Sequence, residues 1–143
     1  MRTLKLSIVL LFVSILSYSQ CVTQFFGAKY TQNKTISLNV SQLNPDYSYS
    51  GLQATMPLFD SKTFLANAEV GRGIVINKVG FIGYGVIGLY IYDFGDWKLN
   101  YGIGFQTFYK NVFVGVNCTN KEHLGIKLGI CFNSMLCPIK YHK

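Results

Sequence analysis

The stretch from Trp97 to Phe132, WKLNYGIGFQTFYKNVFVGVNCTNKEHLGIKLGICF, alternates apolar residues with small or polar ones over three consecutive segments. One face of the first segment carries Leu99, Tyr101, Ile103, Phe105, Thr107 and Tyr109. The other face carries Lys98, Asn100, Gly102, Gly104 and Gln106. A period of two is the spacing of side chains along a β-strand, so this segment is predicted to be a strand.

The next two segments repeat this pattern after short breaks at Lys110 and at 119–121. Their apolar faces carry Val112, Val114 and Val116, and then Leu124, Ile126, Leu128, Ile130 and Phe132. Their opposite faces carry Phe113, Gly115 and Asn117, and then Gly125, Lys127, Gly129 and Cys131. A face rich in Gly, Asn, Gln and Lys does not suit a protein core. It does suit the polar interior of a barrel whose outer face meets lipid.

The same alternation predicts five earlier strands, at 22–31, 35–41, 47–58, 61–76 and 79–92. The fourth of these could instead turn at 71–73, which would give one more strand. The connections are short and carry turn-forming residues such as Asn, Asp, Pro and Gly, so neighbouring strands are expected to be antiparallel. The sequence therefore predicts an all-β fold, an antiparallel up-and-down meander of about eight strands that forms a membrane β-barrel.

Composition separates this prediction from two other fold classes. A helical membrane protein is excluded because no long apolar run follows the first 19 residues. A soluble β-sandwich would place charges on its solvated face, yet only 13% of the residues are charged and the mean hydropathy is +0.26. A barrel with one lipid-facing side accounts for this intermediate hydropathy.

The N-terminus carries the features of a secretory signal peptide. Arg2 and Lys5 precede an apolar run over 8–16, and the small residues Ser17 and Ser19 follow at the two positions that a signal peptidase reads. That run is about half of the roughly 20 residues that a spanning helix needs. We expect cleavage after Ser19, a barrel domain over 20–132 and a C-terminal tail over 133–143. An exported barrel of this kind is expected in the outer membrane.

The basic charge of the chain does not indicate a nucleic-acid partner. The formal net charge is +7, or +5 without Arg2 and Lys5, but the remaining lysines are dispersed and form no patch. Most lie at predicted strand ends, at the level where they would meet lipid phosphates. Outer-membrane lipids are therefore the expected partners, and nucleic acid is not.

The mature chain resembles the small eight-stranded outer-membrane barrels of the OmpA-like and OmpX-like families in length, strand count, glycine-rich inner faces and aromatic strand ends. Phe132 closes the last predicted strand, as the terminal aromatic residue of the assembly signal does in those families. The resemblance implies the barrel assembly machinery as a partner. The sequence departs from the family pattern because eleven residues, 133–143, follow Phe132.

Three charged residues are predicted to face the barrel interior: Glu69, Lys98 and Lys127. They are accompanied there by the amides Gln53, Asn67, Asn100 and Gln106. Glu69 is the only carboxylate on these predicted inner faces. Since charges in a narrow interior need partners, we expect Glu69 to pair with Lys127 or Lys98.

The four cysteines suggest a link between the chain ends. If the first strand pairs with the eighth, Cys21 should come near Cys131 or Cys137, and an exported protein meets an oxidising compartment. A Cys21–Cys137 disulfide is one prediction. The alternative is that Cys21 is free or lipidated and the tail is disordered, although Tyr18 and Gln20 do not fit a lipidation signal.

Motifs for catalysis, metal or cofactors are not found. The chain has no Gly-x-Ser-x-Gly elbow, phosphate loop, His-Glu-x-x-His or Cys-x-x-Cys. Glu122 and His123 could serve a lipid-modifying enzyme, but no suitably placed serine accompanies them. We expect a non-enzymatic outer-membrane barrel without cofactors, in a structural or surface-interaction role. A secreted soluble β-sheet binding or adhesion module is the first alternative, and a lipid-modifying barrel enzyme is the second.

Overall fold

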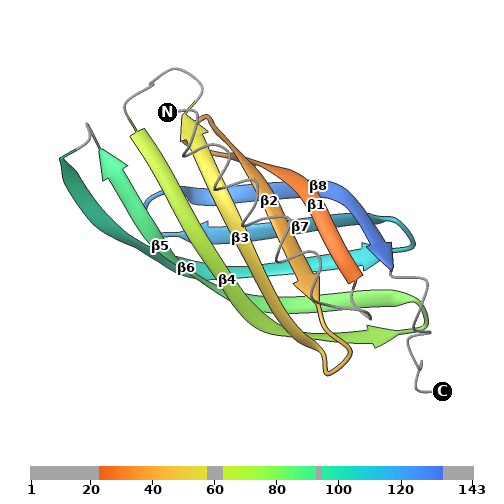
Figure 1. The fold of residues 1–143 in the computed structure, drawn as a ribbon. Helices are drawn as coiled ribbons and strands as arrows, with labels where there is room; N and C mark the ends of the chain where they lie inside the picture. Colours follow the sequence, from red (N-terminus) through yellow and green to blue (C-terminus); the bar gives the residue numbers. More distant parts are fainter. Residues whose placement is uncertain (1–22, 58–62, 93–94, 134–143) are drawn as a thin grey trace, which may run out of the picture.

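Eight antiparallel strands form an up-and-down meander that closes into a barrel (Figure 1), which confirms the predicted fold. The computed structural model describes residues 23–57, 63–92 and 95–133. The strands are β1 (Thr23–Thr31), β2 (Thr35–Leu43), β3 (Ser48–Pro57), β4 (Thr63–Ile76), β5 (Val79–Tyr92), β6 (Asp96–Tyr109), β7 (Val112–Thr119) and β8 (His123–Asn133). No helix in these residues is long and apolar enough to cross a membrane.

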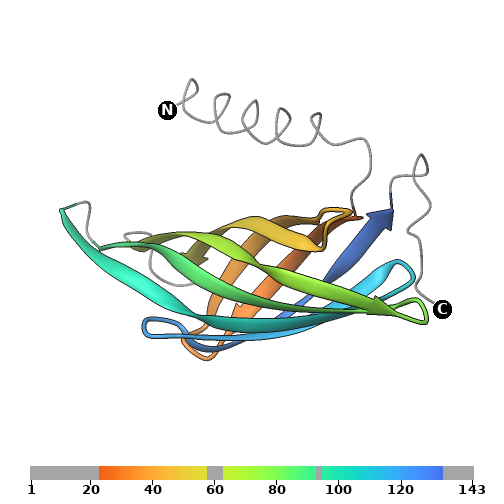
Figure 2. The same cartoon turned by 90° about the horizontal axis from the view of Figure 1, so that it is seen from below.

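The strand bounds lie close to the expected ones, and two features of β4–β7 are informative. β4 runs unbroken through 71–73, so the alternative of a turn there is wrong. β5 and β6 pair along their whole length, whereas β7 pairs with β6 only as far as Gly102. The β5–β6 hairpin therefore extends beyond β7 at the end away from the start of β1 (Figure 2), while β4 accompanies β5 along its whole length.

The register fixes how wide the barrel is. A line of paired residues that leaves β1 at Thr23 crosses every strand and returns to β1 at Thr31, eight residues further on. On the way it passes Leu43, Tyr49, Gly71, Tyr84, Gly104, Asn117 and Gly125. Eight strands with a shear of eight tilt by about 36°. The interior is then just wide enough to be filled by side chains.

Short turns connect the strands at both ends. At the β4–β5 turn, Asn77 and Lys78 have φ of 49° and 71°, the left-handed pair that matches the twist of a two-residue hairpin. At the β2–β3 turn, the Asp46 carboxylate accepts hydrogen bonds from the Ser48 hydroxyl (2.6 Å) and backbone N–H (3.0 Å). These bonds, the hydroxyl first, hold the pKa of Asp46 below its ordinary value.

The outer face of the barrel is apolar around the whole circumference, as the alternation predicts. Leu38 on β2 is 70% exposed, Ile103 on β6 is 74% exposed and Leu128 on β8 is 60% exposed. Between the strand ends, Arg72 is the one charged side chain on the outer face of the described strands. Most of the buried side chains in the barrel interior are polar or charged.

Several predictions concern residues that are not described. The signal peptide over 1–19, Cys21, Cys137 and the tail after Asn133 all lie outside the described residues. Within them, β1 and β8 pair from Thr23–Asn133 to Thr31–Gly125, as a closed meander requires.

Candidate functional site

The barrel interior has an apolar end and a charged middle. At the end where β1 starts and β8 finishes, buried apolar side chains form a cluster, which we call the aromatic plug. The plug consists of Phe25, Leu43, Tyr49, Ile82, Tyr84, Val86, Phe108, Phe113 and Cys131. The Phe25 ring packs edge-on against Phe108 and Phe113, with centroids 5.1 and 5.5 Å apart. This packing fills the interior at that end.

Inward-facing glycines make room for the rings. A Cβ added at Gly104 would lie 2.3 Å from a carbon of the Tyr84 ring, and one added at Gly27 would lie 2.5 Å from the Phe113 ring. Both distances are below any real carbon contact. Gly104 and Gly27 are therefore the small partners of large side chains from other strands.

The first ion pair of the interior joins β8 to β4. The ammonium of Lys127 contacts the Glu69 carboxylate, and both side chains are fully buried. The other oxygen of Glu69 accepts hydrogen bonds from the Tyr49 hydroxyl (2.8 Å) and from Asn39 Nδ2 (3.2 Å). Lys127 Nζ also lies 4.4 Å from the centroid of the Tyr84 ring. Protein groups thus compensate both buried charges.

A second ion pair lies nearer the opposite end. Lys29 Nζ is 2.6 Å from Glu122 Oε2, and both side chains are buried. Asn67 Nδ2 donates to the same oxygen at 3.4 Å, and Asn100 Nδ2 donates to Asn67 Oδ1 at 2.9 Å. This chain of contacts ties β1, β4, β6 and the β7–β8 turn together across the interior.

Three sequence predictions about these charges need correction. Glu69 is not the only inward carboxylate, because Glu122 in the β7–β8 turn folds over the barrel end, its N–H bonded to Thr119 Oγ1 at 3.1 Å. Lys29, one of the dispersed lysines, does not lie at an exposed strand end, because the β1 register turns it inward with Phe25. Lys98 does not join the network. It is exposed because the β5–β6 hairpin continues past β7 at that point.

Some buried polar atoms on the β5–β7 side have no hydrogen-bond partner among the described residues. They are the Tyr84 hydroxyl, Asn100 Oδ1, Gln106 Nε2 and both side-chain polar atoms of Asn117. Buried groups of this kind usually bind ordered water in native proteins. Within the described residues, the buried polar atoms without a hydrogen-bond partner are thus concentrated on the β5–β7 side of the interior.

The Glu122–His123 pair does not form a catalytic arrangement. Glu122 is buried and bonded to Lys29, while His123 is exposed at the start of β8 with a φ of 55°. The two side chains therefore lie in different environments. Within the described residues, no three His, Cys, Asp or Glu side chains are grouped closely enough to hold a metal ion.

The two described cysteines are free thiols in different surroundings. Cys131 is buried in the aromatic plug, with its Sγ 3.2 Å from the Lys110 carbonyl oxygen, whereas Cys118 is exposed. The predicted partners Cys21 and Cys137 lie outside the described residues, so that disulfide stays a prediction.

No protein-family model, no curated protein and no solved structure matches this chain. What the barrel does must therefore be inferred from its own geometry: an apolar outer face, a plugged end and two buried ion pairs.

Proposed function

We propose that this chain is a non-enzymatic β-barrel of the outer membrane, exported by the signal peptide over 1–19, with a structural or surface-interaction role. The observation that carries this proposal is the inverted distribution of polarity. Large apolar side chains are exposed on every side of the barrel, while Lys127 and Glu69 are 0% exposed at its centre. Lipid is the solvent that makes such a distribution favourable.

The alternative of a secreted soluble module fits this distribution poorly. A soluble monomer seldom exposes a contiguous apolar patch larger than a few hundred Å². A protein partner for this chain would have to cover exposed apolar side chains on seven of the eight described strands rather than one side of a sheet. A bilayer covers them all at once.

Strand length supports the same proposal. Every strand except β7 has nine or more residues, which matches the roughly 9–11 residues that a tilted strand needs to cross the hydrocarbon core. The charges of the described residues lie at turns and strand ends, in the interior, or at Arg72. Outer-membrane lipids and the barrel assembly machinery are the partners that this placement implies.

Transport of solutes is not part of the proposal. An eight-stranded barrel has room for side chains only, and the aromatic plug fills one end of this one. The described connections between strands are also short, which leaves little surface for a large ligand. A structural or surface-interaction role remains.

Cell fractionation combined with gel mobility tests the proposal. The mature protein should sediment with the outer membrane, need detergent for extraction, and migrate differently in SDS before and after boiling. Recovery from the culture medium as a detergent-free soluble protein with one gel mobility would instead support the secreted binding module.

A further inference from the structure

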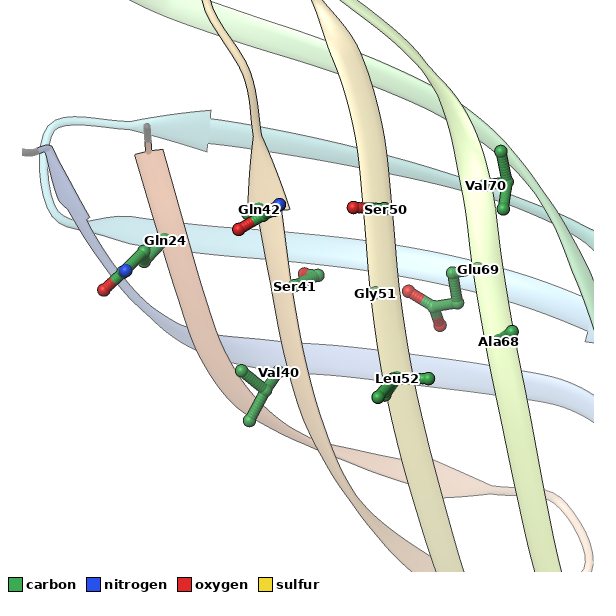
Figure 3. Close-up of a pocket in the computed structure, with 10 residues that line it drawn as sticks. All are labelled: Gln24, Val40, Ser41, Gln42, Ser50, Gly51, Leu52, Ala68, Glu69 and Val70. Carbon is green, nitrogen blue, oxygen red and sulfur yellow. The ribbon is translucent and has the colours of Figure 1, made fainter. Parts of the chain in front are cut away.

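The outer wall of the barrel is hollowed over β1–β4. The hollow has a volume of about 290 Å³, near the lower limit of ligand pockets. Ten residues line it: Gln24, Val40, Ser41, Gln42, Ser50, Gly51, Leu52, Ala68, Glu69 and Val70 (Figure 3). Seven of them belong to the outward-facing positions of their strands. We call this feature the outer groove.

The outer groove is polar at one end and apolar at the other. Gln24, Gln42 and Ser50 follow one another across β1, β2 and β3 by register, toward the end where β1 starts. Val40, Leu52 and Ala68 form a second row, further from that end (Figure 3). Amide and hydroxyl groups therefore lie next to a surface of aliphatic and small side chains. A lipid molecule has the same order, with a polar headgroup followed by an apolar acyl chain.

Arg72 lies beside the polar end of the groove. It follows Val70 on the outer face of β4 and pairs by register with Ser48 on β3 and Gly83 on β5. A Cβ added at Gly83 would meet nothing within 4 Å, so space is open beside the exposed guanidinium. Within the described part of the chain, no hydrogen bond or ion pair of this guanidinium is found. The Asp46 carboxylate in the β2–β3 turn attracts it electrostatically, but that carboxylate accepts its hydrogen bonds from Ser48.

An arginine on a lipid-facing surface needs an anionic partner. Its cost is about 2–4 kcal/mol at mid-bilayer and falls to about 0–1 kcal/mol near the interface. The guanidinium binds phosphate through paired hydrogen bonds. Arg72 lies on the outer wall toward the end where β1 starts, with the apolar row displaced toward the barrel middle, so a phosphate held there would direct an acyl chain along that row.

We propose that the outer groove binds one glycerophospholipid, whose phosphate contacts Arg72 and whose acyl chain packs on Val40, Leu52 and Ala68. This inference rests on the proposed membrane location. It goes further because it assigns one lipid a specific binding site on the outer wall.

Native mass spectrometry tests the proposal on the folded full-length mature protein in a maltoside detergent, with palmitoyl-oleoyl phosphatidylethanolamine added. The parent should retain one phospholipid per barrel. Arg72→Gln should weaken retention by about tenfold or more, the effect of losing a charge-assisted hydrogen bond. Lys98→Gln removes the same charge at the far end of β6 and should retain the lipid as the parent does.

A second pair of variants tests the acyl-chain seat. Ala68→Phe fills the outer groove without touching the interior and should lower lipid retention several-fold. Ala66→Phe places the same ring two residues away on the same outer face, outside the groove, and should leave retention unchanged.

Equal retention by the parent and Arg72→Gln, no stoichiometric lipid on the folded parent, or a dimer in its place would overturn the lipid site. Boiling-dependent gel mobility, measured on the same samples, reports separately on the membrane barrel. Loss of that mobility shift together with detergent-free solubility would overturn the proposed function instead.

Discussion

At the residue scale, the stability of the barrel after substitutions in its interior depends on the ion pair between Lys127 and Glu69. Two buried charges must be compensated by each other and by nearby polar groups, here the Tyr49 hydroxyl and the Asn39 amide that donate to Glu69. Removing one partner leaves the other uncompensated. Replacing both partners by neutral side chains of similar size avoids that penalty.

We therefore predict that Glu69→Gln lowers the free energy of unfolding by about 3–5 kcal/mol, because Lys127 stays buried without a counter-charge. The double variant Glu69→Gln, Lys127→Met should recover most of that loss. Urea unfolding in detergent, followed by the fluorescence of the single tryptophan, Trp97, measures both. Equal stability of the parent and the single variant would mean that the charge is not buried as described.

A second prediction compares two glycines. Both have ordinary negative φ values, so alanine fits either backbone. Gly104→Ala should destabilise the barrel by about 1–3 kcal/mol because the new methyl group meets the Tyr84 ring. Gly83→Ala faces open space on the outer wall and should be neutral or slightly stabilising. The same unfolding measurement distinguishes them, and similar effects at both sites would contradict the described ring packing.

The alternation of side chains along a strand predicts which residues face the interior, but only within regular strands. Glu69 and Lys127 sit in regular strands, so alternation places both inside. Glu122 was missed because it lies in a turn, where alternation carries no information about direction. Lys29 could have been found by counting from Gly27 along the first strand, whereas the exposure of Lys98 depends on where β7 ends, a tertiary feature.

At the element scale, β8 shows the outer face most clearly. Its even-numbered residues from Leu124 to Ile130 are all about half exposed or more, and its odd-numbered residues face the interior. The odd-numbered residues of β6 and the even-numbered residues of β7 face outward in the same alternating way. Alternation over these strands was enough to predict the facing because each runs without a bulge in its register.

We predict that Leu128→Arg costs about 2–4 kcal/mol in a bilayer, because the charge would enter the hydrocarbon region. Gln32→Arg, in the exposed β1–β2 turn, should cost little and is the matched control. Asn120 is a poorer control because its side chain bonds to the backbone of Tyr101 and Leu99. Unfolding of vesicle-inserted protein measures the costs, and equal tolerance at 128 and 32 would contradict a lipid-facing β8.

Sequence alternation left open whether β4 continues through 71–73. The run Gly71–Arg72–Gly73 has the composition of a turn, yet β4 passes straight through it. The reason is tertiary: a Cβ at Gly71 would lie 2.1 Å from the Gly83 carbonyl oxygen, so glycine there permits close approach of β5 rather than a chain reversal.

At the scale of the whole molecule, the barrel is closed at one end. The aromatic plug fills the interior there, and the ion pairs cross it further along. We predict no stable conductance steps when the protein is inserted into planar bilayers. Boiling-dependent mobility of the same preparation verifies that the protein is folded, and regular conductance steps from folded protein would contradict the plug.

The central claim is that the apolar outer face is a continuous ring immersed in lipid. Leu38, Ile103, Val116 and Ile126 face outward on four strands. Spin labels at these positions, in a cysteine-free variant inserted into vesicles, can be probed with lipid-soluble oxygen and with a water-soluble nickel chelate. The claim predicts that all four labels are accessible to oxygen and shielded from the chelate. Accessibility to the chelate at any of these positions would contradict it.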